Sequence, residues 1–244
     1  MKNFSYNEYA YIINWLNTHY TINKFTDINK DSDNFCVIRH DVEFSIDRAL
    51  RLALLENKLG ISTTYLFQIR NNVYNALSVD NVKKIRKIHE LGHDIGLHVH
   101  RGLLEDYNTI EDMICTDIDI LSKITGIDTQ IFSLHRPTIE LLTTNIKIDG
   151  LINTYDKLYF HSYADAVPPK NLNVKYIADS NHIWKYGYPT TINHSKLQCN
   201  FHPFSWTEIG YENTPNFKTL IEEKTMELIN SISTEIKTFP KELL

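Results

Sequence analysis

The stretch FCVIRHDVE, residues 35–43, decides the fold. It begins as a short apolar run and becomes polar at its end, which predicts a buried strand with charged side chains at its carboxyl end. A helical pattern follows over residues 45–58 and stops at Gly60. A strand that leads directly into a helix is the repeating unit of parallel sheets, so this stretch favours an α/β fold.

The strand-then-helix order recurs along the chain. We expect strands at 62–67, 94–98, 130–134, 151–154, 175–178 and 197–201, and helices at 79–91, 104–125 and 217–232. An amphipathic helix at 6–18 precedes them and could cap one end of a barrel. Six or seven such units without a dinucleotide glycine fingerprint favour a closed barrel over an open doubly wound sheet. The length of 244 residues suits one domain, 1–244, with its core at about 35–206.

Composition excludes several classes of function. The formal net charge of -5 and the absence of a basic run give no reason to expect nucleic acid as a partner. Three widely spaced cysteines, Cys36, Cys115 and Cys199, are typical of reduced, buried thiols. The first residues lack the apolar core of a signal peptide, and no segment is apolar enough for a membrane span, so we expect a cytoplasmic protein. The sequence does not indicate an oligomeric state.

Polar clusters follow five of the expected strands, at residues 40–43, 98–100, 135–137, 179–180 and 202–203. In parallel α/β folds the working residues lie at these carboxyl ends. Side chains alternate along a strand, so Asp41 and Glu43 should share a side, as should His98 and His100 if their strand stays extended. Imidazole and carboxylate ligands suit zinc and similar divalent metals, and an ion-pair network is the alternative interpretation.

Five motifs resemble, in order and spacing, those of the polysaccharide deacetylase family, of the carbohydrate esterase family 4 type, in its variant with an HDV-D/E first motif. They are RHDVE at 39–43, ELGHDIGLH at 90–98, LHRP at 134–137, YIADS at 176–180 and NFHP at 200–203. The resemblance implies a distorted (β/α) barrel with fewer than eight strands. It also implies a hydrolase that removes an N-acyl group from a sugar with a metal-bound water.

The resemblance assigns roles by position. Asp41 matches the general base, His98 the first metal-binding histidine, Arg136 the arginine that orients the base, and His202 the histidine that protonates the leaving amine. Two positions depart from the family pattern, because Val42 replaces a second aspartate and Gly102 replaces a second histidine. We therefore expect a rearranged metal site of Glu43, His98 and His100. Asp41 is then the base or a further ligand, and His135 is a further candidate for a metal ligand.

Substrate contacts are expected from Asp179, His135 and Trp206. The segment from about 155 to 184 is predicted to form long loops over the site. Its aromatic residues are candidates for a sugar-stacking wall, although such residues more often fill a core: Tyr155, Tyr159, Phe160, Tyr163 and Trp184.

Three functional hypotheses follow. The first is a metal-dependent deacylase, with zinc as the expected metal, acting on a nucleotide-linked or lipid-linked amino sugar in surface-polysaccharide biosynthesis. The second is a degenerate sugar-binding protein of the same fold, suggested by the two altered motifs. The third is a metallohydrolase of the amidohydrolase type, suggested by His98 and His100. It fits less well, because those barrels carry the His-x-His pair on the first strand, where this chain has acids.

Overall fold

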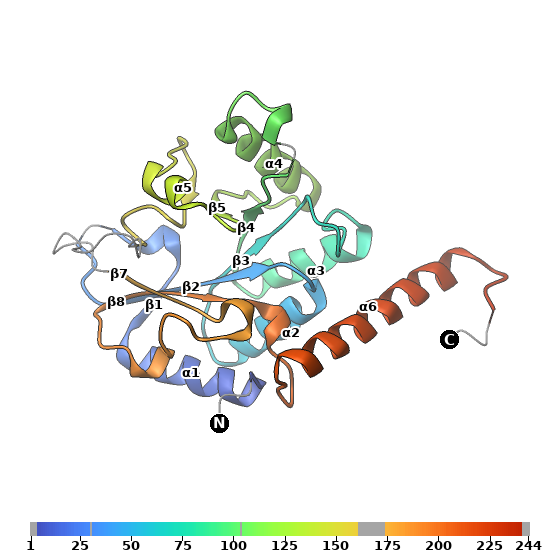
Figure 1. Cartoon of the computed structure of the whole chain (residues 1–244), viewed down its shortest axis with the longest axis horizontal. Helices are drawn as coiled ribbons and strands as arrows, with labels where there is room; N and C mark the ends of the chain where they lie inside the picture. The colour runs from blue at the N-terminus through green and yellow to red at the C-terminus, as the bar shows by residue number, and fades with distance from the viewer. Residues whose placement is uncertain (1–3, 30, 103, 161–173, 241–244) are drawn as a thin grey trace.

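The computed structural model describes residues 4–29, 31–102, 104–160 and 174–240. Parallel strands form one curled sheet in the order β6-β5-β4-β3-β2-β8-β7, and the short β1 pairs with β2 beside this path (Figure 1). The strands are β1 (Thr21–Asn23), β2 (Phe35–Val42), β3 (Thr64–Phe67), β4 (Asp94–Val99), β5 (Ile131–Leu134), β6 (Ile152–Asn153), β7 (Val174–Ala178) and β8 (Lys196–Phe201). Every strand pairing is parallel. The prediction of a distorted (β/α) barrel is confirmed, and β6 and β7 do not pair with each other in the described residues.

The helices are α1 (Tyr6–His19), α2 (Ile46–Lys58), α3 (Val79–Glu90), α4 (Ile110–Thr125), α5 (Ile139–Thr144) and α6 (Asn213–Glu235). The predicted helix at 104–125 begins later than expected, because the Thr109 hydroxyl accepts a hydrogen bond from the backbone N–H of Asp112 and starts the helix there. Residues 104–106 form only a 3₁₀ turn. Within the described residues, no helix is both long and apolar enough to cross a membrane.

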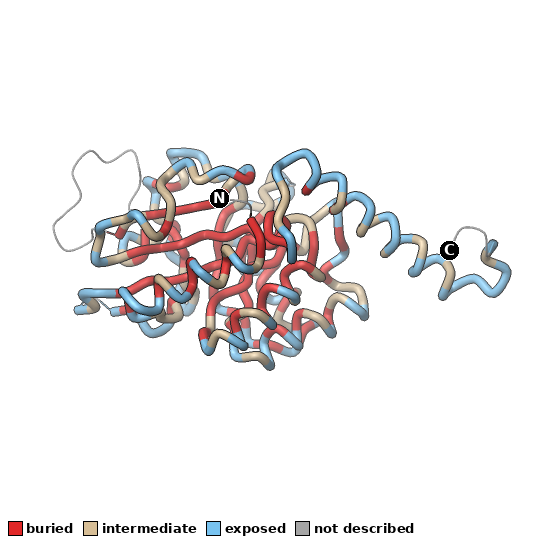
Figure 2. The backbone as a smooth tube through the Cα atoms, turned by 90° about the horizontal axis from the view of Figure 1, so that it is seen from below, coloured by how far each residue is buried: buried red, intermediate tan, exposed pale blue. Residues whose placement is uncertain are grey.

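β2 is buried along its whole length, and its side chains alternate between two environments. Phe35 and Val37 pack in the interior of the curl, whereas Cys36 and Ile38 pack outward against α1. The same alternation carries Asp41 to the interior face and His40 to the outer face. Figure 2 shows the strands buried through the middle of the molecule, with α6 leading away from it and largely exposed.

β4 requires glycine at its centre. A Cβ atom on Gly96 would lie 2.3 Å from Leu66 Cδ2 and 2.6 Å from the carbonyl oxygen of Ile131, and the contact with this backbone atom could not be relieved by moving a side chain. The glycine therefore lets β3 and β5 approach β4 closely on the interior side. This tight packing holds the carboxyl ends of the three strands next to one another.

A buried carboxylate joins α2 to the outer face of the sheet. Glu56 is fully buried, and its two oxygens accept hydrogen bonds from Tyr9 (2.5 Å), His40 (2.9 Å), Thr63 (2.9 Å) and Tyr65 (2.6 Å). Burial raises the pKa of Glu56, but the charge and hydrogen bond of His40, followed by His93, lower it to about 2. The carboxylate is therefore ionised and paired in the folded protein.

We expect Glu56→Gln to lower the free energy of unfolding at pH 7 by about 3 kcal/mol, because it removes one partner of a buried charged network. The folded pKa lies below the unfolded value of about 4.3, so this contribution is present above about pH 4.5 and is lost as the pH falls towards 2. Urea unfolding in EDTA should show that the difference in the free energy of unfolding between wild type and variant narrows from pH 7 to pH 3.5. Glu222→Gln on exposed α6 is the control. A difference that does not depend on pH would contradict the ionised state of Glu56.

Candidate active site and metal centre

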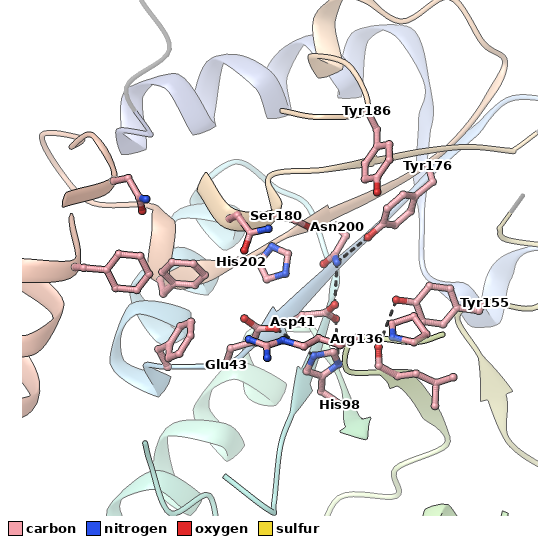
Figure 3. A pocket seen from close by; sticks show the side chains of 17 residues that line it. Asp41, Glu43, His98, Arg136, Tyr155, Tyr176, Ser180, Tyr186, Asn200 and His202 are labelled. Atoms are coloured by element: carbon pink, nitrogen blue, oxygen red, sulfur yellow. Dashed lines mark hydrogen bonds and ion pairs between the residues drawn. The ribbon is translucent and has the colours of Figure 1, made fainter. Parts of the chain in front are cut away.

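The interior-facing polar side chains meet at the carboxyl ends of the strands and line a cavity of about 370 Å³, here called the main pocket (Figure 3). Asp41 and Glu43 come from β2 and the residues after it, and His98 comes from β4. Asn200 and His202 come from β8 and the turn that follows it. The remaining lining residues are Phe44, Leu134, Arg136, Pro137, Tyr155, Tyr176, Ser180, Asn181, Tyr186, Phe204, Asn213 and Phe217.

Glu43, His98 and His135 form the group that could hold a metal ion among the described residues, and are here called the metal trio. Glu43 Oε1 lies 2.9 Å from His135 Nδ1 and 3.6 Å from His98 Nε2, and the two ring nitrogens are 3.2 Å apart. Ligands at the usual bond length of about 2.1 Å around a tetrahedral zinc ion are separated by roughly 3.4 Å. The three atoms already have nearly this spacing, so the residues fit a divalent metal.

His100 does not belong to this group, contrary to the expected ligand set. β4 ends at Val99, so the alternation that would align His100 with His98 stops one residue too early. The His100 ring stacks on His135 instead, with ring centroids 5.4 Å apart, and its Nδ1 accepts a hydrogen bond from the Gly102 N–H. His135, which the sequence offered as a further candidate, is the third member of the metal trio.

A hydrogen-bonded chain behind the metal trio fixes the orientation of His98. The hydroxyl of Ser133 donates to Asp41 Oδ1 at 3.3 Å, and its oxygen lies 2.7 Å from His98 Nδ1. Since the single hydroxyl hydrogen of Ser133 is directed to the carboxylate, His98 Nδ1 carries the hydrogen of the second bond. The lone pair of His98 Nε2 is then free to face Glu43 and His135.

Asp41 is held by groups that the sequence interpretation missed. Its Oδ2 accepts a hydrogen bond from Asn200 Nδ2 at 2.8 Å and lies 3.3 Å from Arg39 Nη2. Arg39 is fully buried and also donates to Thr154 Oγ1 and to the Tyr155 hydroxyl. Burial raises the pKa of Asp41, but the Arg39 guanidinium, followed by His98 and His202, lowers it below its usual value. Asp41 is therefore ionised in the folded protein.

Arg136, which the resemblance assigned to orient the base, forms no hydrogen bond or ion pair with Asp41 in the described residues. It follows β5 with a φ of 48°, and its side chain is exposed at the rim of the main pocket. The orienting contact comes from Arg39, two residues before Asp41 on the same face of β2. Arg39, Asn200 and Ser133 each precede a predicted site residue by two positions, so strand alternation was the signal that could have found them.

His202 is oriented by Asp179, which is fully buried and is not exposed to the main pocket as a substrate contact would be. Asp179 Oδ1 lies 2.6 Å from His202 Nδ1, and Oδ2 accepts a hydrogen bond from Trp206 Nε1 at 2.7 Å. Burial lowers the pKa of His202, but Asp179, followed by Glu43 and Asp41, raises it to about 9. His202 is consequently protonated at neutral pH, with Nε2 as its remaining donor.

The expected aromatic wall is largely replaced by other residues. Trp206 is completely buried and packs against Tyr9 and Phe201, so no ring face remains for a sugar. Tyr159 and Phe160 are also buried, and Trp184 packs in the outer core. Tyr163 lies outside the described residues. Among the described members of the predicted set, Tyr155 alone lines the main pocket, where Tyr176 and Tyr186 join it (Figure 3).

Neither a protein-family model nor a curated protein sequence matches this chain. Solved structures of carbohydrate esterase family 4 are similar to it. A CE4 family pseudoenzyme from Bacillus anthracis has 11% sequence identity and a TM-score of 0.42, with 80% of this chain and 62% of that chain covered. A family 4 carbohydrate esterase from the same organism has 12% identity and a TM-score of 0.42, covering 88% and 85%. One from Streptomyces lividans, in complex with acetate, has 11% identity and a TM-score of 0.41, covering 78% and 89%.

Arg39→Met is expected to raise the pKa of Asp41 by at least about one unit, because a buried carboxylate loses its closest cation. Carbon-13 NMR of the aspartate carboxyl groups in EDTA would measure this, with Asp41→Asn to assign the signal and circular dichroism to confirm folding. Arg136→Met is the matched control and should leave the Asp41 signal unchanged. A raised Asp41 pKa in Arg136→Met but not in Arg39→Met would contradict the pairing of Arg39 with Asp41.

Proposed function

We propose that this protein is a metal-dependent hydrolase that removes an N-acyl group, such as acetyl, from an amino sugar. The observation that carries the proposal is the convergence of three kinds of group on one cavity. Glu43 and His98 of the metal trio line the main pocket together with an ionised carboxylate (Asp41) and a protonated imidazole (His202), and His135 lies 2.9 Å from Glu43. Amide hydrolysis needs these three functions: activation of water, acceptance of its proton, and protonation of the leaving nitrogen.

Glu43, His98 and His135 would hold the metal, and their two nitrogens and one oxygen form a donor set found in catalytic zinc sites. A bound divalent ion would lower the pKa of water and polarise the acyl oxygen. Asp41 would accept the proton of the water, and Arg39 and Asn200 keep that carboxylate ionised and fixed in position. His202 would donate its Nε2 proton to the amine nitrogen while Asp179 stabilises the imidazolium.

The shape of the main pocket supports a sugar as the substrate. Its volume of about 370 Å³ is in the range of pockets that enclose small ligands. Three tyrosines, Tyr155, Tyr176 and Tyr186, line its wall, and Ser180 and Asn213 add polar side chains. This combination suits a ring with one apolar face and several hydroxyl groups. The proposal includes an acetyl or similar acyl group and a role in surface-polysaccharide biosynthesis.

Purified wild-type protein should contain about one equivalent of a divalent metal, with zinc expected from the donor set. Mass spectrometry of the metal content should show its loss in His98→Ala and in His135→Ala, because each removes one of three ligands. His100→Ala is the matched control and should retain the metal. Loss in the His100 variant with retention in the His135 variant would reject the metal trio.

Release of acetate or formate from N-acylated amino sugars should fall by about 10²–10⁴-fold in His202→Gln, which removes the proposed proton donor. For the wild type, kcat should decline as the pH rises to about 9, since His202 must be protonated to act. His194→Gln is a control outside the main pocket and should leave kcat unchanged. A metal-loaded wild type that binds acyl sugars without hydrolysing them would instead favour the sugar-binding hypothesis.

A further inference from the structure

A second pocket of about 180 Å³ lies beside the main pocket and is here called the side pocket. The two share Glu43, Phe44 and Arg136 at their common boundary. His135 of the metal trio also lines the side pocket. A chemical group bound in the side pocket would therefore lie next to the acyl group that the metal trio would hold.

The hydrogen-bond network fixes which end of the Gln68 amide is free. Asn71 Oδ1 accepts from the backbone N–H groups of Val73 (2.6 Å) and Tyr74 (3.2 Å), so Asn71 Nδ2 is its donor end. That nitrogen donates to the carbonyl oxygen of Glu43 (2.9 Å) and to Gln68 Oε1 (2.6 Å). Gln68 Nε2 is left as a donor that has no partner among the described residues, although Gln68 is only 4% exposed. A buried donor without a partner is a place for a ligand acceptor.

Glu43, the carboxylate of the side-pocket lining, is paired with His135 at 2.9 Å. The other free polar groups of the side pocket are donors. His100 Nδ1 accepts from the Gly102 N–H, so the neutral ring carries its hydrogen on Nε2. Arg136 forms no ion pair with a carboxylate in the described part of the chain, and its carbonyl oxygen accepts a hydrogen bond from Arg101 Nη2 at 3.4 Å. Arg70, by contrast, is neutralised by Asp117 at 2.6 Å.

The left-handed backbone of Arg136, with φ of 48°, carries a conformational cost for a residue with a side chain. It places a cation that has no ion pair among the described residues at the boundary of the two pockets, where the Glu43 carboxylate is paired with His135. The exposed amide of Asn72 offers both a donor and an acceptor, so it does not change the excess of donors among the free groups. The free groups together are suited to a ligand that only accepts hydrogen bonds and carries negative charge.

We propose that the side pocket binds an anionic group, a phosphate or a carboxylate, carried by the same sugar whose acyl group enters the metal trio. The inference rests on the proposed function, and it narrows the substrate to charged amino sugars. Gln68 and His100 would donate to the oxygens of the anion, and Arg136 would supply the charge.

Isothermal titration calorimetry with four probes tests the inference: pyrophosphate, N-acetylglucosamine, its 1-phosphate, and N-acetylmuramic acid, which carries a carboxylate. One of the two charged sugars should bind at least about tenfold more tightly than the neutral sugar, and which one does so distinguishes phosphate from carboxylate. Arg136→Gln and Gln68→Leu should each reduce that advantage. Arg51→Gln, which removes an equal charge from exposed α2, should retain it.

Each titration is repeated in EDTA, because an anion that binds only the metal loses its affinity there. Equal binding of charged and neutral sugars, binding only with metal, or an advantage that survives in Arg136→Gln would each overturn the inference, as would no binding at all. Hydrolysis of neutral acyl sugars with no preference for charge would leave the proposed function intact. Binding of charged sugars in the side pocket without any acyl release would remove the proposed function alone.

Discussion

The rest of the structure depends on a constraint at β2, a strand that is buried on both faces and yet carries ionisable side chains on both. A buried charge is tolerated only when it is paired and hydrogen-bonded. On the interior face Arg39 pairs with Asp41, and on the outer face His40 pairs with Glu56 of α2. The interior pair provides the ionised carboxylate of the candidate site, and the outer pair ties the supporting helix to the same strand. The chemistry and the packing of the molecule are therefore coupled through one strand.

The candidate site is organised in two layers of side chains. Residues at the pocket, such as His98 and His202, each have a neighbour behind them that fixes the ring: Ser133 for the former and Asp179 for the latter. Such outer partners decide which ring nitrogen carries hydrogen and which faces the cavity. Two neighbouring pKa values are shifted in opposite directions from behind the pocket, because Arg39 lowers the pKa of Asp41 and Asp179 raises that of His202. An acid and a base can thus coexist at neutral pH in one pocket, as the proposed reaction requires.

Much of the fold was predictable because parallel strands and amphipathic helices have local signatures. The order of the units and the strands around residues 35–41, 94–98 and 130–134 were expected. Short elements such as β1 and α5 were missed, because three to six residues give too little periodicity. α4 begins later than expected, because Thr109 caps its first turn.

The sequence by itself determined which residues stand at the carboxyl ends of the strands, because a strand must bury its apolar run and turn polar where it ends. Asp41, Glu43, His98 and His202 could be named on that basis. Only the tertiary structure decided which groups meet them. His135 rather than His100 lies with Glu43 and His98, and Arg39 rather than Arg136 pairs with Asp41, because the course of the chain beyond a strand end depends on neighbouring strands and loops. Trp206 and Asp179 were taken for substrate contacts, yet both lie beneath the pocket, because burial depends on packing between segments far apart in the chain.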